Sequence, residues 1–464
     1  MRRRGTAAVL AALLLGTGCS VTGCEAAGPA PAPAPSARSL PASPSGTGGP
    51  VGDGDWPTYH RDNARTGVAP GFPALGTLRR AWTAALDGAV YGQPLLVGDT
   101  VYAATEHDTV SALAADTGQV RWSVHLGEPM PGRQLPCGNI DPLGITSTMV
   151  YDPATGLVFA LAETVGAHHT LFGIDARTGA VKVSRAAEPP RGDPVAHQQR
   201  SALTLLGDRV YIAYGGLAGD CANYVGSVVA IPTSGSGPGL AYAVPTSREG
   251  GIWTPGGGTV HNGRLLYAVG NGEATSGTYD GSDSVIALDA DLKPLDRFAP
   301  STWADDNDGD LDLGSMTAVV VNGYVLIAGK RGIGFTLRTD HFGGIGGQVA
   351  QARVCRAFGG AAVDGDTAYV PCPDGVRAVQ VDTGGQLHVR WRAAVPAAGS
   401  PVLGGGALWV VDYDGGVLYA LDPGTGRVRQ QLPIGGAPHF ASPTLGRGQV
   451  YVGTLTGVTA VSAR

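Results

Sequence analysis

The chain is poor in the residues that mark several common classes of protein. Only three of its 32 basic residues are lysines, and its net charge is −6. A net negative, lysine-poor chain argues against nucleic acid as a partner. Charged residues make up only 15% of the chain, and no long helical periodicity is present. Helical and coiled-coil classes are therefore disfavoured.

Short catalytic and metal motifs are missing as well. There is no C-x-x-C pair typical of a structural zinc site, no H-E-x-x-H, no G-x-S-x-G and no P-loop. The ten histidines are scattered. We interpret His197, in "AHQQRS", and the pair His168–His169 as loop residues, so common hydrolase and zinc-peptidase chemistry has no support.

The N-terminal apolar run is too short to span a bilayer. Arg2, Arg3 and Arg4 precede "AAVLAALLLG", the form of a secretory signal. In "VTGC", Cys24 has an aliphatic residue three positions before it and a small residue just before it. We expect cleavage before Cys24, a diacylglycerol on its thiol, and a protein lipid-anchored to the outer face of the cell membrane. The alternatives are ordinary cleavage with secretion and an uncleaved anchor.

The composition divides the chain into three parts. Residues 1–23 form the expected signal peptide. Residues 24–52 are rich in Pro, Ala, Ser and Gly, and such a stretch buries too little apolar surface to fold, so we predict a disordered tether. Residues 53–464 have a globular composition and form the expected folded domain.

Four cysteines fall in the folded part, and an even number in an exported protein predicts two disulfides. Cys355 and Cys372 lie at the two ends of an expected hairpin. Our preferred pairing is therefore Cys355–Cys372 and Cys137–Cys221, although the sequence alone allows three pairings.

The chain contains an internal repeat. "PLLVGDTVYAATEHDTVSALAADTGQVRWS" (94–123) and "PVLGGGALWVVDYDGGVLYALDPGTGRVRQQL" (401–432) share one pattern: an apolar pair, a Gly turn, two alternating strands, a turn that closes in T-G, and a further strand. Weaker copies begin near the following positions: Ile145, Ser201, Thr259, Met316 and Ala361. A truncated copy from Ser442 ends the chain. The fold class is therefore all-β.

Radial stacking of such four-stranded sheets buries their faces and protects their edges, as in a β-propeller. At about 40–50 residues for each repeat, the chain predicts an eight-bladed propeller; seven blades and a β-sandwich array are the alternatives. The last copy lacks its final strand. We expect "LRRAWTAAL" (78–86) to supply it, with Trp82 in the place that Trp122 takes in the first copy.

The repeat resembles a known family. "VSALAADTGQVRW" and "LYALDPGTGRV" are similar to the A-L-D-x-x-T-G-x-x-x-W repeat of the pyrroloquinoline quinone (PQQ) propeller superfamily. That superfamily contains alcohol dehydrogenases that bind PQQ and Ca²⁺ on the propeller axis. It also contains non-enzymatic scaffolds, such as the lipoprotein of the outer-membrane assembly machinery. The resemblance implies the fold directly and catalysis only through matching site residues.

The resemblance implies a set of site residues. Trp253 in "GGIWTPGGG" matches the Trp beneath the quinone, and Asn271 in "GNG" matches a calcium ligand. Asp310 and Asp312 in "DGDLDLGS" are candidates for the base, with Asp310 preferred, and Lys330 in "AGKRG" matches the Lys at the quinone oxygens.

Departures from the enzymes are also present. Their second calcium ligand is a Glu, for which this chain offers only Asp220; their vicinal cysteine pair and the C-x-x-C-H haem motif are absent. Each candidate also has a purely structural interpretation. Trp253 could be a core residue and Asn271 a turn residue, Lys330 could be a solvated cation, and the aspartates could form a hydrated loop.

Two functions therefore compete. The first is a non-catalytic binding or assembly scaffold with a protein partner on the propeller face. The second is a PQQ- and Ca²⁺-dependent dehydrogenase of an alcohol or a sugar.

Overall fold

The computed structural model describes residues 52–464. The expected signal peptide, the predicted lipidation site Cys24 and almost all of the expected tether lie outside the described residues. No helix in the described part is long and apolar enough to cross a membrane.

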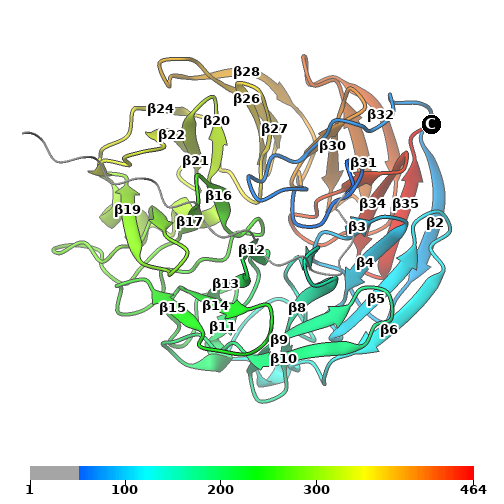
Figure 1. Cartoon of the computed structure of the whole chain (residues 1–464). Coiled ribbons are helices and arrows are strands. Elements are labelled where there is room, and N and C mark those ends of the chain that lie inside the picture. Colours follow the sequence, from blue (N-terminus) through cyan, green and yellow to red (C-terminus); the bar gives the residue numbers. More distant parts are fainter. Residues whose placement is uncertain (1–51) are drawn as a thin grey trace, which may run out of the picture. The chain divides into compact units, whose positions relative to one another are not determined.

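The described residues form eight sheets arranged in a ring, an eight-bladed β-propeller (Figure 1). Their strands pair antiparallel, apart from two short parallel pairings at sheet edges. The first blade contains β3 (Leu95–Val97), β4 (Thr100–Ala104), β5 (Thr109–Ala114) and β6 (Val120–His125), and the second contains β7 (Val150–Asp152), β8 (Leu157–Thr164), β9 (His168–Asp175) and β10 (Val181–Ala186). The third blade contains β11 (His197–Gln198), β12 (Thr204–Leu206), β13 (Arg209–Gly216), β14 (Ser227–Pro232) and β15 (Leu240–Ala243). The fourth blade contains β16 (Thr259–His261), β17 (Arg264–Val269), β18 (Ser284–Leu288), β19 (Pro294–Ala299) and β23 (Gly344–Ile345).

The other four blades complete the ring. The fifth blade contains β20 (Val319–Val321), β21 (Tyr324–Ala328), β22 (Ile333–Arg338) and β24 (Ala350–Arg353), and the sixth contains β25 (Ala362–Asp364), β26 (Thr367–Cys372), β27 (Gly375–Val381) and β28 (Leu387–Ala393). The seventh blade contains β1 (Val68–Ala69), β29 (Val402–Gly404), β30 (Ala407–Asp412), β31 (Val417–Leu421) and β32 (Val428–Pro433). The eighth blade contains β2 (Arg79–Ala85), β33 (Thr444–Gly446), β34 (Gln449–Thr454) and β35 (Gly457–Ser462). Short helical turns occur in four places: η1 (Gly132–Gln134), η2 (Pro194–Ala196), α1 (Trp303–Asp308) and η3 (Leu313–Ser315).

The ring closes as the sequence predicts. β2, from the N-terminal part of the chain, pairs antiparallel with β35, so the last blade combines both ends of the folded chain. The predicted eight blades, the predicted closing strand and the two predicted disulfides are confirmed; in each disulfide the Cα atoms are 6.1 Å apart.

The repeat motif has a physical basis in a tryptophan that docks on the next blade. Trp82 donates from Nε1 to the carbonyl of Ala115, at 3.0 Å, in the T-G turn of the neighbouring blade. Gly118 in that turn has φ +73°, and a Cβ there would lie 2.5 Å from the indole. Only glycine satisfies both the positive φ and the close approach. The same pairing recurs at Trp122 with Gly179 and at Trp391 with Gly426.

The core lies between neighbouring blades. Tyr102 of the first blade packs with Val158 and Ile174 of the second, and each further pair of blades repeats this arrangement. Since the apolar faces of two sheets bury each other, the alternating strands of the repeat need the closed ring to be stable.

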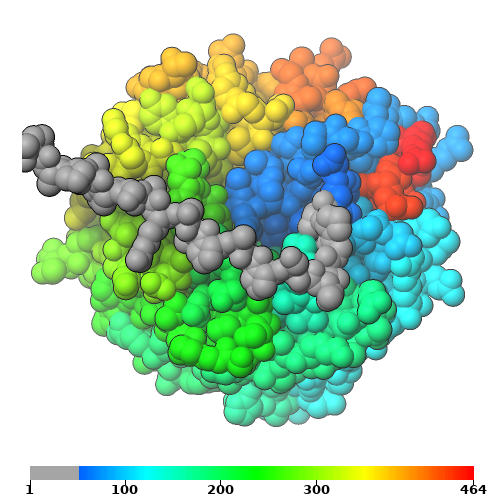
Figure 2. Space-filling model, in the orientation of Figure 1, coloured from blue at the N-terminus to red at the C-terminus, as the bar shows by residue number. Residues whose placement is uncertain are grey.

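Residues 52–76, the axial segment, cross one end of the ring's axis. In Figure 1 this part of the chain is dark blue near the centre of the ring, and Figure 2 shows its atoms near the middle of the same face. The segment bonds to the innermost strands of several blades, as at Trp56 N to Leu96 O (2.6 Å) and Val363 N to Thr66 O (2.8 Å). Nothing in the sequence repeat predicted this arrangement.

Arg65 is the centre of the axial segment and is fully buried. Its guanidinium donates to five oxygens: Thr58 Oγ1 (2.8 Å), Thr204 Oγ1 (2.7 Å), Gly258 O (3.0 Å), Tyr59 O (3.1 Å) and Leu203 O (3.4 Å). Burial lowers the pKa of Arg65 to about 10. One side chain thus joins the axial segment to the third blade and to the loop that leads into the fourth.

Candidate active site on the propeller axis

A cavity of about 340 Å³ lies on the axis, formed largely by the loops that lead into the innermost strands. Five of the six residues predicted for the site line it: Asp220, Trp253, Asp310, Asp312 and Lys330. The structure therefore brings together side chains that are up to 110 positions apart in the sequence. Their chemical roles remain predictions.

The acidic stretch between the fourth and fifth blades does not form one loop. Residues 303–308 form the short helix α1, which the sequence did not predict, and Asp306 within it is buried against Arg331 and the hydroxyl of Thr302. Asp310 has φ +49°, a left-handed conformation that is uncommon for a residue with a side chain. Only Asp310 and Asp312 reach the cavity.

Lys330 joins these two carboxylates. Its Nζ lies 2.6 Å from Asp310 Oδ1 and 2.6 Å from Asp312 Oδ2. The side chain of Asp310 is 70% exposed, whereas those of Asp312 and Lys330 are 10% and 15% exposed. Burial raises the pKa of Asp312, an effect that Lys330 opposes. Burial would lower the pKa of Lys330, but the two carboxylates outweigh it and raise that pKa, so Lys330 stays charged.

Asn271 orients the two carboxylates rather than lining the cavity itself. Its backbone N donates to Asp312 Oδ1 at 2.7 Å, and its Nδ2 donates to Asp310 Oδ1 at 3.0 Å. Gly270 precedes it because a Cβ there would lie 2.3 Å from Asp312 Oδ1. The pair Gly270–Asn271 therefore lets the carboxylate of Asp312 approach the backbone closely, and is more than a turn.

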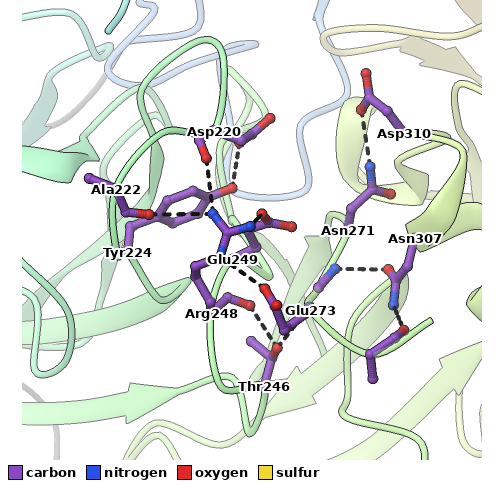
Figure 3. Close-up of polar contacts among 12 residues, drawn as sticks. Asp220, Ala222, Tyr224, Thr246, Arg248, Glu249, Asn271, Glu273, Asn307 and Asp310 are labelled. Atoms are coloured by element: carbon purple, nitrogen blue, oxygen red, sulfur yellow. Dashed lines mark hydrogen bonds and ion pairs between the residues drawn. The ribbon is translucent and has the colours of Figure 1, made fainter. Parts of the chain in front are cut away.

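The oxygen donors predicted for calcium do not fit that ion as they lie. Asn271 Oδ1 is buried without a partner, but Asp220 Oδ1 accepts from the hydroxyl of Tyr224 at 2.5 Å, away from the Asn271–Asp310 pair (Figure 3). Within residues 52–464 no group of three or more Asp, Glu, His or Cys side chains could hold a metal ion. Calcium needs about six to eight oxygen ligands, and Lys330 already supplies positive charge to Asp310 and Asp312.

Arg200 is a site residue that the sequence reasoning missed. It is buried, lines the cavity, and lies over the ring of Tyr91 at 5.5 Å. Its only hydrogen bonds within the described residues go to carbonyls, those of His439 at 2.9 Å and Thr146 at 3.4 Å. A guanidinium that faces a cavity and forms no ion pair can bind an anion there. The interpretation of "AHQQRS" as a loop is wrong, because His197 begins strand β11.

The pair His168–His169 is likewise not in a loop. It begins strand β9, and His169 is buried between Glu163 and Glu188, with Nδ1 2.9 Å from Glu188 Oε2. Burial lowers its pKa, but these two glutamates outweigh burial and raise the pKa to about 9. His169 therefore forms buried ion pairs with two glutamates and does not line the cavity.

The aromatic wall of the cavity was also only partly predicted. Trp253 packs its Cβ against Gly215, where an added Cβ would lie 2.6 Å away. Its ring lies 6.2 Å from that of Phe440, tilted by 38°, and Phe440 stacks on Phe358 at 5.9 Å. Since a flat ring needs roughly 3.5 Å on each side, none fits between Trp253 and Phe440 as they lie. A planar ligand on Trp253 would use the part of the indole that Phe440 leaves free.

The fold and the axial cavity define an eight-bladed propeller with a polar and aromatic site on its axis. The family model described as outer membrane protein assembly factor BamB matches residues 75–291 and 343–464. The chain belongs to this family. The unmatched segment between those ranges contains Asp310, Asp312 and Lys330.

The chain is also similar to individual proteins. It is 26% identical over 288 residues to the polyvinylalcohol dehydrogenase of Sphingopyxis sp. (strain 113P3), covering 54% of this chain and 40% of that protein. It therefore spans less than half the length of this curated relative.

Solved structures share the fold. The quinohemoprotein alcohol dehydrogenase from Comamonas testosteroni matches with a TM-score of 0.69 and 16% identity, over 88% of this chain and 80% of that chain. BamB from Moraxella catarrhalis matches with a TM-score of 0.53 and 16% identity, over 83% and 97%. At this identity the likeness shows the propeller alone.

Proposed function

We propose that this protein is an exported oxidoreductase that binds PQQ in the axial cavity and oxidises a hydroxyl group of an alcohol or a sugar. One observation carries the proposal: an aromatic face, two cationic groups and an exposed carboxylate, from distant parts of the chain, line one cavity. The acid–lysine group lies in the segment that the assembly-factor family model does not match, which favours chemistry over a scaffold role.

The cavity suits the chemical character of PQQ, which is flat, aromatic and rich in carboxylates. Trp253 offers a flat apolar face, and Arg200 has N–H donors to spare for a carboxylate. Lys330 adds positive charge on the acidic side of the cavity. PQQ, when bound, would accept the electron pair that leaves the substrate carbon.

Asp310 is the residue placed to take the hydroxyl proton. Its Oδ1 is held by Lys330 and Asn271, while its Oδ2 has no hydrogen-bond partner among the described residues and the side chain is exposed. Asp312 uses both oxygens internally, on Asn271 N and Lys330 Nζ. Asp312 therefore positions Lys330, and Asp310 acts as the general base. No step is assigned to calcium, because the donors do not fit it.

The test is titration of the purified protein with PQQ, with and without Ca²⁺, followed by reduction of an artificial dye in the presence of alcohols and sugars. Lys330→Met should weaken PQQ binding about tenfold or more, because one charge-assisted contact is lost. Lys293→Met is the matched control, since this lysine is 73% exposed and does not line the cavity. Absence of PQQ binding under every condition would rule the proposal out.

The second candidate is a non-catalytic scaffold that binds a protein partner on the propeller face. The family match over residues 75–291 and 343–464 favours it. A protein that takes up no PQQ, but whose partner binding is lost on substituting residues of the propeller face, would support this function instead.

The cellular location is a separate proposal. We propose a lipid anchor on Cys24, so that Cys24→Ser releases the protein from membranes or leaves its signal uncleaved, while Cys19→Ser changes little. Equal behaviour of the two variants would contradict the anchor at Cys24.

A further inference from the structure

We infer that the Cys137–Cys221 disulfide is a clamp that holds one wall of the axial cavity in shape and thereby sets the cavity's affinity for its ligand. The inference rests on the proposed function for the identity of the ligand, but not for the clamp itself. The clamped wall consists of residues 137–140 and 217–221.

Both sides of this disulfide reach the cavity within a few residues. Asn139 and Ile140 follow Cys137, while Leu217 and Asp220 precede Cys221, and all four line the cavity. The two segments belong to different blades and are 84 positions apart at the cysteines. The disulfide therefore joins two loops from different blades at the wall of the cavity.

Little else holds the first loop against the second. The backbone of residues 130–143 bonds to itself, as at Met130 with Leu143 (2.8 Å in both directions), and Gly132 N donates to Asp141 Oδ1 at 2.8 Å. No hydrogen bond joins the two halves of the clamped wall. Their remaining contact is a small apolar cluster of Met130, Leu143 and Leu217 with partly buried neighbours that include Cys137 and Ile140.

The second loop is held in a conformation that a free chain avoids. Asp220 has φ +49° and Ala222 has φ +61°, so Cys221 lies between two residues in the left-handed region. Such strain persists only where other contacts hold it. Cys221 is thus fixed on one side by its bond to Cys137.

Arg248 holds the same loop from the other side (Figure 3). Its Nη1 donates to Asp220 O at 3.1 Å and to Ala222 O at 3.4 Å, while its Nε donates to Glu273 Oε2 at 2.9 Å. Arg248 connects the loop to the fourth blade, and the disulfide connects it to the loop between the first two blades. With the disulfide cut, Arg248 alone would not hold residues 137–140 at the cavity.

The consequence is a ligand affinity that depends on the disulfide. Reduction by a dithiol breaks the S–S bond, converts Cys137 and Cys221 to thiols, and oxidises the dithiol to its cyclic disulfide. The freed loops must then be ordered again when a ligand binds, and that ordering opposes binding. The second disulfide, Cys355–Cys372, is a built-in control, because backbone hydrogen bonds also hold its segment at the cavity: Ala357 N donates to Gly329 O and Phe358 N to Pro371 O, both at 3.3 Å.

The experiment compares the oxidised protein with the variants C137S/C221S and C355S/C372S, each at a temperature where thermal unfolding shows it folded. Calorimetric titration with PQQ should give a Kd about tenfold weaker for C137S/C221S, from the ordering of a few side chains. The Kd of C355S/C372S should stay within about twofold of that of the oxidised protein, because backbone hydrogen bonds of residues 354, 357 and 358 still hold the segment that carries Phe358. Equal Kd values in all three proteins, or equal losses in both variants, would overturn the clamp.

Hydrogen exchange separates this inference from the proposed function. In C137S/C221S, faster exchange should be confined to residues 130–143 and 216–224. If the oxidised protein binds no PQQ, the proposed function fails, and the clamp is judged on exchange alone. Faster exchange in these two loops then supports it, and unchanged exchange overturns it.

Discussion

At the scale of single residues, burial decides what each aspartate of the acidic stretch does. Asp305 lies exposed on α1, Asp306 is buried against Arg331, and Asp312 is buried against Lys330. Within this stretch, Asp310 alone combines an exposed carboxylate with a place in the cavity. Neighbours in sequence therefore have different roles, because a buried carboxylate needs a partner and an exposed one does not.

Asp310→Asn tests the assignment of the base. It should lower turnover with PQQ by about 10²-fold or more, the usual loss for a general base, while the Kd for PQQ changes little. Steady-state dye reduction and a PQQ titration measure the two quantities. Asp305→Asn, on the exposed face of α1, is the control and should leave both unchanged; full turnover in Asp310→Asn would move the role of base elsewhere.

At the scale of elements, the interface between the first two blades contains a group of buried carboxyl side chains. Glu106, Asp108 and Glu163 are buried, and both oxygens of Asp108 lack partners. Burial raises the pKa of Glu106 to about 7 and that of Asp108 to about 9. A carboxyl whose pKa is raised on folding stabilises the fold at low pH and loses that contribution as the pH rises through its folded value.

Stability should therefore fall as the pH rises from about 5 to about 9. Glu106→Gln keeps the acceptor for Gly144 N and Thr146 Oγ1 but cannot ionise. It should raise the unfolding temperature at pH 8 by about 2 °C and have little effect at pH 5. Thermal unfolding from pH 5 to pH 9 checks this; a constant gain at every pH would show that the effect is not due to ionisation.

The tryptophan docking between blades gives a second prediction at this scale. Gly118→Ala adds both a positive-φ penalty and a clash with Trp82, so it should destabilise the protein by about 3 kcal/mol. Gly263→Ala is the matched control, because Gly263 has φ +74° and open space around its would-be Cβ. The control should cost only about 1 kcal/mol. Denaturant unfolding of both variants measures the difference in stability. Equal losses of stability would mean that the indole of Trp82 moves aside at no energetic cost.

At the scale of the whole molecule, the axial segment joins blades that are distant in the chain. Arg65→Met would remove donors from five oxygens and leave several of them buried without partners. The expected loss of stability is about 3–5 kcal/mol, with no direct effect on the cavity residues. Denaturant unfolding measures this loss. Arg61→Met is the control and should lower the stability little, because the side chain of Arg61 bonds, among the described residues, only to the exposed carbonyl of Asp53. An equally small loss of stability in Arg65→Met would show that Arg65 does not hold the blades together.

The sequence by itself left three pairings of the four cysteines open, but it determined the eight blades and their closing strand. These follow from turn chemistry, strand alternation and the T-G and Trp positions, all of which repeat along the chain and depend on local contacts or on the neighbouring blade. The family repeat also indicated Trp253, Asn271, Lys330 and the aspartates, because each stands beside a recognisable motif. Only the tertiary structure decided that Lys330 bridges Asp310 and Asp312, that Arg200 faces the same cavity, and that Cys137–Cys221 clamps its wall. These contacts join loops from different blades, and no local pattern records which loops will meet once the ring has closed.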